Sequence, residues 1–353
     1  MASTVLNKVF SWEDLQLLRT SLIALMSIFS AVIAMGQVES SKIYRGSIGN
    51  KHIEMRLNRS GNKVTGKYFY DQFKQDLTLE GAYDPKGKLE LVEGSGKQKT
   101  GKFVCQAESE TPDIDLECEW SRPDGTRKSL VFLVEQSITL KDGLELTPKT
   151  TIDPRTKASG SYPQLKAAVM TPSINAFNSL VESRLRSAMK DFQPESVKES
   201  SFETNYNVLM ATNDFISIEM LEDSYAGGAH PNTRYWTVNY NLKTNKELTL
   251  KDVLRDENYK TDLAEFVAKD INRRADEIEM SEAKRNNRQP EKRENPIMSA
   301  EELPELDTFG LSAKGFVAYF DFAHVIAVFN KTVVPYGVLA RHLRPDGVVP
   351  IVR

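Results

Sequence analysis

The residues best suited to chemistry gather in one short stretch, Ser224–Thr233, which reads Ser-Tyr-Ala-Gly-Gly-Ala-His-Pro-Asn-Thr. Gly227 and Gly228 can adopt positive φ without steric cost, while Pro231 fixes its own φ and favours an extended conformation at His230. Strand-like runs flank the stretch at residues 215–221 and 234–242. We therefore expect a shaped loop that joins two paired strands at one edge of a sheet.

This loop has a structural and a functional interpretation, and the two are compatible. In the structural one, the glycines and Pro231 form the turn and Asn232 hydrogen-bonds its own backbone. In the functional one, Tyr225 supplies a stacking ring, while His230 and Asn232 supply hydrogen-bond donors and acceptors for a sugar or a protein. The candidate ligand-binding residues are Tyr225, Gly227, Gly228, His230, Pro231 and Asn232.

Acidic residues just before the loop offer an alternative, an envelope glycoside hydrolase or another hydrolase. Glu219, Glu222 and Asp223 would supply a carboxylate pair near His230. Such a pair must lie about 5–10 Å apart, a distance that the sequence does not give. The chain has no GxSxG elbow, no HExxH motif and no Cys/His metal-binding spacing. We therefore expect a non-enzymatic protein, with no catalytic residue, metal or cofactor.

The other histidines have simpler interpretations. His324 falls on the same strand face as Phe320, Phe322 and Ile326, within the apolar run 316–329. A run that is apolar on both faces predicts a strand in the middle of a covered sheet, so we expect His324 to be a core residue. No supporting pattern surrounds His52 or His342.

The first 36 residues have the pattern of a signal peptide. Arg19 precedes an apolar run at 21–35, which ends in Ala34-Met35-Gly36, a small-x-small signal for cleavage before Gln37. A signal anchor is the alternative, because the apolar run is only slightly shorter than the ~20 residues of a membrane span. We expect a periplasmic or secreted protein, which contacts the membrane only if the leader is uncleaved.

The length and charge of the chain indicate how many domains it has and which partners are expected. A chain of 353 residues is long enough for two domains, and its formal net charge is -3. No basic stripe stands out that would suit a phosphate backbone, so nucleic acid is not an expected partner.

Cys105 and Cys118 are the only cysteines. They flank a turn signal at 110–113, and in an oxidising compartment this arrangement predicts a disulfide that closes a hairpin. A loop of this size would be stabilised by roughly 3 kcal/mol in the chain-entropy model.

Residues 37–140 predict an all-β meander or small barrel-like domain. Apolar residues such as Ile53, Met55 and Leu57 alternate with polar ones between turn clusters. Thr65-Gly66-Lys67-Tyr68 recurs as Thr100-Gly101-Lys102-Phe103, as expected of hairpins in one closed or nearly closed sheet. Four aromatic residues could form a sugar-stacking face, but their alternation favours core packing: Tyr68, Tyr70, Tyr83 and Trp120.

The remainder predicts a linker and a second domain. Residues 141–160 are rich in Lys, Thr, Pro, Gly and Ser and indicate a linker. Residues 161–353 predict an α+β domain, an antiparallel sheet with packed helices. Helices are expected over residues 172–192 and 259–278, where apolar residues recur at three- and four-residue spacing.

The loop and its surroundings resemble a bacterial extracytoplasmic domain-of-unknown-function family of the DUF3298 kind. The resemblance rests on Tyr225–Asn232, Asn239–Leu242 and Leu248–Leu254, and extends over about 161–343. Related proteins include the C-terminal domain of the anti-sigma factor RsiV and the non-catalytic region of the peptidoglycan deacetylase PdaC. The family usually has a tyrosine and a glycine where this chain has Phe329-Asn330-Lys331-Thr332.

The resemblance implies a binding domain that faces the cell envelope, with a lysozyme-like protein or peptidoglycan as partner. It carries neither signalling nor deacetylation to this chain. A purely structural or assembly role is a third possibility.

Overall fold

The computed structural model describes residues 40–106, 114–194, 196, 198–228 and 230–349. The predicted signal peptide and the turn at 110–113 lie outside the described residues. Among the helices that are described, none is long and apolar enough to cross a membrane.

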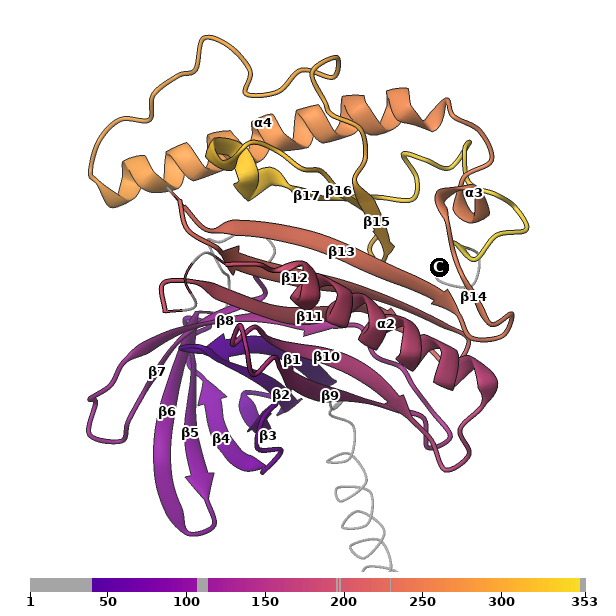
Figure 1. Cartoon of the computed structure of the whole chain (residues 1–353). Helices are drawn as coiled ribbons and strands as arrows, with labels where there is room; N and C mark the ends of the chain where they lie inside the picture. The colour runs from indigo at the N-terminus through magenta and orange to yellow at the C-terminus, as the bar shows by residue number, and fades with distance from the viewer. Residues whose placement is uncertain (1–39, 107–113, 195, 197, 229, 350–353) are drawn as a thin grey trace, which may run out of the picture.

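The first part of the chain is a closed antiparallel barrel in which β1 pairs with both β2 and β8 (Figure 1). This confirms the predicted barrel-like domain. Tyr68 is buried in its core, and Tyr70, Tyr83 and Trp120 pack against that core, so these rings do not form an exposed stacking face. The strands are β1 Ser40–Ile48, β2 Lys51–Ser60, β3 Lys63–Tyr70, β4 Leu77–Tyr83, β5 Leu89–Ser95, β6 Gln98–Gln106, β7 Leu116–Ser121 and β8 Ser129–Gln136.

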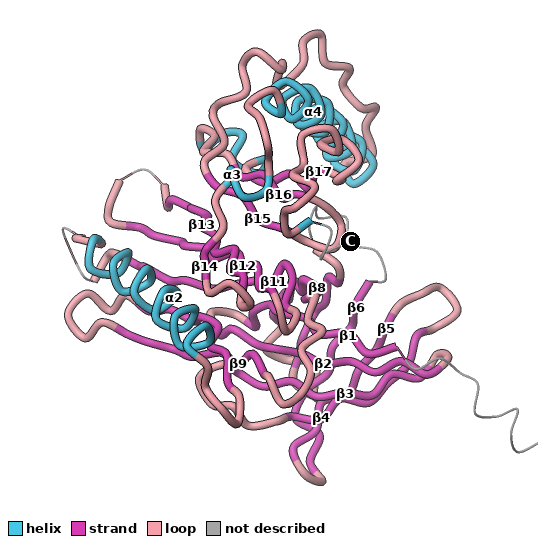
Figure 2. The backbone as a smooth tube through the Cα atoms, turned by 90° about the vertical axis from the view of Figure 1, so that its right-hand side faces the viewer, coloured by secondary structure: helices cyan, strands magenta, loops and turns pink. Residues whose placement is uncertain are grey.

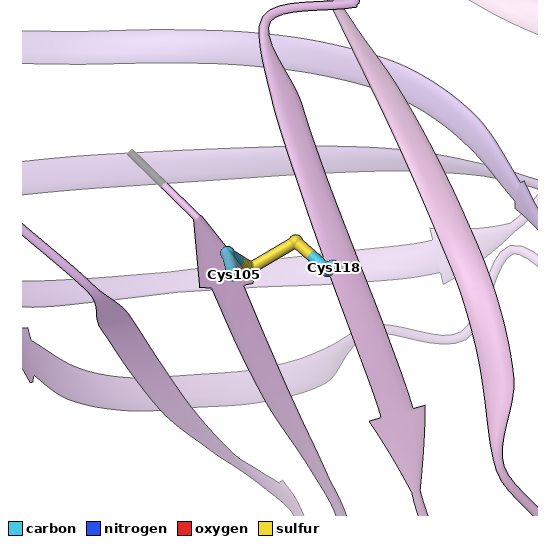
Figure 3. The surroundings of a disulfide bond; sticks show 2 residues. All are labelled: Cys105 and Cys118. Atoms are coloured by element: carbon cyan, nitrogen blue, oxygen red, sulfur yellow. A yellow bond between two sulfur atoms is a disulfide. The ribbon is translucent and has the colours of Figure 1, made fainter. Parts of the chain in front are cut away.

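Two local features hold the barrel strands close together. A Cβ at Gly66 would collide with the Arg56 carbonyl oxygen on β2, so glycine at this position allows the two strands to approach closely. Cys105 on β6 lies directly opposite Cys118 on β7, and the two form the predicted disulfide (Figure 3).

The second part is built on a six-stranded sheet in the order β14-β13-β12-β11-β10-β9. All its pairings are antiparallel except β10 with β11, which run parallel over two residue pairs. The strands are β9 Glu145–Ile152, β10 Ser159–Lys166, β11 Ser201–Ala211, β12 Phe215–Tyr225, β13 Asn232–Asn241 and β14 Lys246–Glu247.

Different elements cover the two faces of this sheet. Helix α2, Pro172–Asp191, begins after its N-cap Thr171 and shares a core with Ile216. The neighbouring Phe215 points the other way, into a core with helix α4 and a three-stranded sheet (Figure 2). These further elements are α3 Leu250–Val253, α4 Tyr259–Arg285, β15 Thr308–Leu311, β16 Phe316–Tyr319, the 3-10 helix η1 His324–Phe329 and β17 Lys331–Val334. The predicted α+β architecture is therefore confirmed.

Two predicted segments differ from the structure. The range 141–160, expected to be a linker, contains β9 and the start of β10. Because β9 is an edge strand, its polar residues face solvent and Pro148 is tolerated, so its sequence resembles a loop. The run 316–329, expected to be one strand, ends as a strand at Tyr319 and continues into η1. Periodicity alone does not separate a buried strand from a buried helical segment.

The barrel joins the sheet without an intervening flexible segment. Directly after β8, Ser137 donates its N–H to the Val208 carbonyl at 3.3 Å, and Thr139 donates to the Ala211 carbonyl at 2.8 Å. β10 pairs only with the first part of β11, and the segment that follows the barrel pairs with the end of β11.

Candidate functional site

The predicted loop connects β12 to β13, and we call residues 225–232 the hairpin loop. Gly227 and Gly228 have φ of 111° and 115°, values that L side chains rarely adopt. The Tyr225 hydroxyl donates to the Gly228 carbonyl at 2.9 Å. At the base, the Thr233 hydroxyl donates to the Asp223 carboxylate across the strand pair at 2.6 Å. The loop is thus held in shape by its own contacts.

His230 contacts a second histidine that is distant in sequence. Its ring stacks on that of His324 in η1, with ring centroids 3.9 Å apart and planes 8° from parallel. His324 is exposed, so the prediction of a core histidine was wrong, because the chain turns into η1 before this position. Two exposed apolar side chains on η1 lie within four residues of His324, Val325 at 87 % and Val328 at 60 % exposure.

Asn232 lies exposed at the start of β13. Among the described residues its side chain has no hydrogen bond, so the expected bond to its own backbone is absent there. Its amide is therefore accessible to solvent.

The structure separates the carboxylates that the hydrolase alternative would require. Glu219 contacts the three-stranded sheet, whereas Glu222, three residues later in β12, points to the opposite face. Burial raises the pKa of Glu222, and the nearby Asp191 carboxylate of α2 raises it further, whereas the Arg234 guanidinium lowers it. Asp223 shares a face with Glu219 but lies four strand positions away, about 13 Å at the usual rise per residue. The adjacent Glu222 and Asp223 also point to opposite faces, so the three carboxylates do not converge on one site.

Glu219 belongs instead to a buried cluster that joins the two sheets, which we call the small-sheet joint. Its carboxylate accepts hydrogen bonds from Asn207 at 2.6 Å and from Tyr319, and lies 2.9 Å from the Lys331 ammonium. Burial opposes ionisation, but Lys331, Tyr319 and Asn207 hold the pKa of Glu219 below its ordinary value of 4.5. Sequence reasoning missed these partners, because Tyr319 and Lys331 lie 100 and 112 residues away.

A second buried cluster joins the barrel to the six-stranded sheet, and we call it the barrel seam. Arg45 of β1 donates to Asp71 at 2.6 Å, to the Tyr206 carbonyl at 3.0 Å and to Asn205 at 3.0 Å. Its guanidinium lies 3.7 Å from the centre of the Tyr206 ring. Asp71 also accepts a hydrogen bond from Ser161 of β10.

The ion pair of the barrel seam is almost inaccessible to solvent, with both side chains 1 % exposed. Burial opposes ionisation of Asp71, but the Arg45 guanidinium holds the pKa of that carboxyl below its ordinary range. No local pattern marks Arg45 as buried, because the β1 residues around it, Ile43-Tyr44-Arg45-Gly46-Ser47, do not alternate between apolar and polar. Its partners could not be inferred.

Together these features define a closed barrel fused to an α+β unit that presents a shaped, exposed hairpin loop. Residues 153–233 of that unit match the family model described as Deacetylase PdaC, which confirms the predicted resemblance over this range. The matched range ends just after the hairpin loop.

Two solved structures are similar to the chain. One is a DUF3298 family protein from Pseudomonas aeruginosa PAO1, with 18% identity and a TM-score of 0.38, covering 57% of this chain and 94% of that one. The other is a DUF3298 family member from Bacteroides fragilis NCTC 9343, with 14% identity and a TM-score of 0.37, covering 60% of this chain and 98% of that one. No curated protein matches the chain.

Proposed function

We propose that this chain is a non-enzymatic binding protein of the cell envelope that recognises its partner through the hairpin loop. The supporting observation is that the described residues of the loop combine internal contacts with exposed side chains. Tyr225 and Gly228 close it internally, and His230 is stacked on His324. Contacts that restrain a loop before binding reduce the conformational entropy lost on binding.

A protein partner is the first candidate, and a lysozyme-like protein is the one that the family resemblance suggests. Val325 and Val328 expose apolar area on η1, the same element whose His324 contacts the loop. Exposed apolar side chains beside polar groups suit a protein interface. Peptidoglycan is the second partner to be tested.

The disulfide supports a location outside the cytoplasm. Cys105 and Cys118 are both oxidised, and such bonds persist mainly in oxidising compartments. A periplasmic or secreted protein would meet both candidate partners there.

The test is retention of the purified protein on immobilised lysozyme and on sedimented peptidoglycan. We expect retention on one of them, and at least tenfold weaker binding for the double variant Tyr225→Ala with Asn232→Ala. Thr244→Ala, an exposed position in the turn at the opposite end of β13, serves as the control and should bind as the wild type does. Absence of retention on both surfaces, or equal binding by the double variant, would refute the proposal.

A further inference from the structure

A cavity of about 350 Å³ lies beside the barrel seam, between the barrel and the edge of the six-stranded sheet. Residues from β2 and from the segment after β3 form one side of it, and residues from β9, β10 and β11 form the other. Figure 1 shows β1 and β2 next to β9 and β10 in this region. Small-molecule sites occur preferentially at such junctions between structural units.

The wall of this junction cavity is dense in hydrogen-bonding groups. Ten of its twelve lining residues have polar side chains, mostly hydroxyls, amides and carboxylates. The only large apolar side chain in the wall is Ile152, which is 63 % exposed. A ligand that fits this wall must itself carry many donors and acceptors, because buried polar groups are costly when unpaired.

Part of the wall is rigidly built. Asp71 and Ser161 are buried, and the Ser161 hydroxyl donates a hydrogen bond to the Asp71 carboxylate. The Arg45 guanidinium also donates to this carboxylate and holds it in place. Thr204 is fully buried, and its hydroxyl has no hydrogen-bond partner among the described residues. Such a hydroxyl is a buried group whose hydrogen-bonding capacity the surrounding protein does not use.

His52 and Glu203 face each other across the junction. The Ser47 hydroxyl lies 2.8 Å from His52 Nδ1, and His52 Nε2 lies 3.1 Å from the Glu203 carboxylate without hydrogen-bond geometry. Glu203 is 40 % exposed, so its carboxylate has unused acceptor capacity toward the cavity.

The charges of the wall select the class of ligand. Glu203 lines the cavity without a Lys or Arg partner, whereas the charge of Asp71 is balanced by Arg45, and no Lys or Arg is among the lining residues. An anionic ligand would therefore be disfavoured, and an ammonium group would be favoured near Glu203. The volume lies at the lower end of the usual range of about 300–1,000 Å³ for ligand pockets, which suits one sugar-sized ring.

We propose that the junction cavity binds a single amino sugar or a similar amine-bearing polyol. Its hydroxyls would pair with the Ser, Thr, Asn and Gln side chains of the wall, and its ammonium with Glu203. This site is separate from the hairpin loop, and the inference does not rest on the proposed function.

Isothermal titration calorimetry of the purified protein with three related sugars tests which ligand charge and which ligand class the cavity prefers. Glucosamine is cationic, N-acetylglucosamine is neutral and glucuronate is anionic. We expect saturable binding of glucosamine with a dissociation constant on the order of 1 mM, as is usual for so small a polar ligand. N-acetylglucosamine should bind more weakly, and glucuronate at least tenfold more weakly than glucosamine.

Matched variants test the position of the site. Glu203→Gln should weaken glucosamine binding at least fivefold, whereas Glu199→Gln removes the same charge four residues earlier, outside the cavity, and should change it less than twofold. Thr150→Trp places a large ring at an exposed lining position and should abolish binding, whereas Thr244→Trp should not. Near-equal melting temperatures would show that the variants fold.

Three outcomes would overturn the inference: no saturable binding of glucosamine, equal binding of glucuronate, or equal effects of Glu203→Gln and Glu199→Gln. The hairpin-loop variant Tyr225→Ala with Asn232→Ala should leave glucosamine binding unchanged. Failure of this inference is therefore distinguishable from failure of the proposed function.

Discussion

The barrel seam and the hairpin loop are both rich in polar groups, but these groups are used in opposite ways. In the barrel seam, Arg45 and Asp71 are buried and each has several partners drawn from distant parts of the chain. In the hairpin loop, Tyr225 and His230 each make one hydrogen bond within the loop, His230 also stacks on His324, and the Asn232 side chain is exposed. Burial therefore makes the barrel seam sensitive to the loss of either partner of its ion pair, whereas the loop keeps polar groups exposed.

The comparison also shows that the region with the most contacts is not the region that is easiest to recognise in the sequence. The loop has an unusual local sequence but few contacts, whereas the barrel seam has many contacts and no local motif. The small-sheet joint is intermediate in burial, because Lys331 is 13 % exposed while its partner Glu219 is 2 % exposed. Substitutions should follow this order, with the largest loss of stability in the barrel seam and the smallest in the loop.

The largest effect is expected for Asp71→Ala. This change leaves the Arg45 guanidinium buried without its main counter-ion, and breaking a buried pair from one side costs about 3–5 kcal/mol. We expect the lower end of this range, because Glu54 lies 3.9 Å from Arg45 and partly replaces Asp71. Urea unfolding at pH 7 measures the change in the free energy of unfolding.

Asp76→Ala is the matched control for this measurement. Asp76 pairs with Lys67 at 2.6 Å, but both side chains are about half exposed. Exposed pairs contribute about 0–1 kcal/mol. If Asp71→Ala were no more destabilising than Asp76→Ala, burial would not make the ion pair of the barrel seam more sensitive to substitution than an exposed pair.

The contrast explains how far the sequence could predict this fold. The barrel, the disulfide, α2 and the β12–β13 hairpin all follow from periodicity and turn chemistry, which are local. The pairing of Arg45 with Asp71 and Tyr206 is tertiary, because Arg45 meets Asp71 only when the barrel strands pair and meets Tyr206 only when the barrel docks on β11. No spacing rule along the chain specifies such a contact.

The candidate site was predictable in part for the same reason. Its glycines and Pro231 shape a local turn, so its position and its strand flanks could be read from the sequence. The stacking of His230 on His324 could not, because it depends on the chain turning into η1 after Tyr319. The separation of Glu219 from Glu222 follows from strand alternation, once the strand is known to include both.

An intermediate effect is expected for Lys331→Met in the small-sheet joint. Glu219 would stay buried and lose its ammonium partner, but it would keep the hydrogen bonds from Tyr319 and Asn207. We expect a loss of about 2 kcal/mol at pH 7, less than for a fully broken buried pair. Lys314→Met, at a position 80 % exposed, is the control and should cost less than about 1 kcal/mol.

The pH dependence gives this prediction a second readout. In the wild type the lowered pKa of Glu219 stabilises the fold above its ordinary value of 4.5, and this contribution is lost as pH falls through the lowered value. Without Lys331, burial dominates and raises the pKa, so the variant regains stability when Glu219 is protonated. Urea titrations at pH 7 and pH 4 should therefore show a smaller gap between wild type and variant at pH 4. A constant gap would contradict this account.

The smallest effect is expected in the hairpin loop, for Gly228→Ala. An added Cβ would meet no atom within 4 Å, so the whole cost comes from the backbone, whose φ of 115° disfavours alanine. We expect a loss of about 1 kcal/mol, measured by urea unfolding. Gly337→Ala is the matched control, because its Cβ also meets open space but its φ lies outside the positive region, so it should be neutral or slightly stabilising. Equal effects of the two substitutions would mean that the loop is not held at positive φ in solution. A loss above about 3 kcal/mol would place the loop with the barrel seam in its contribution to stability and erase the contrast between them.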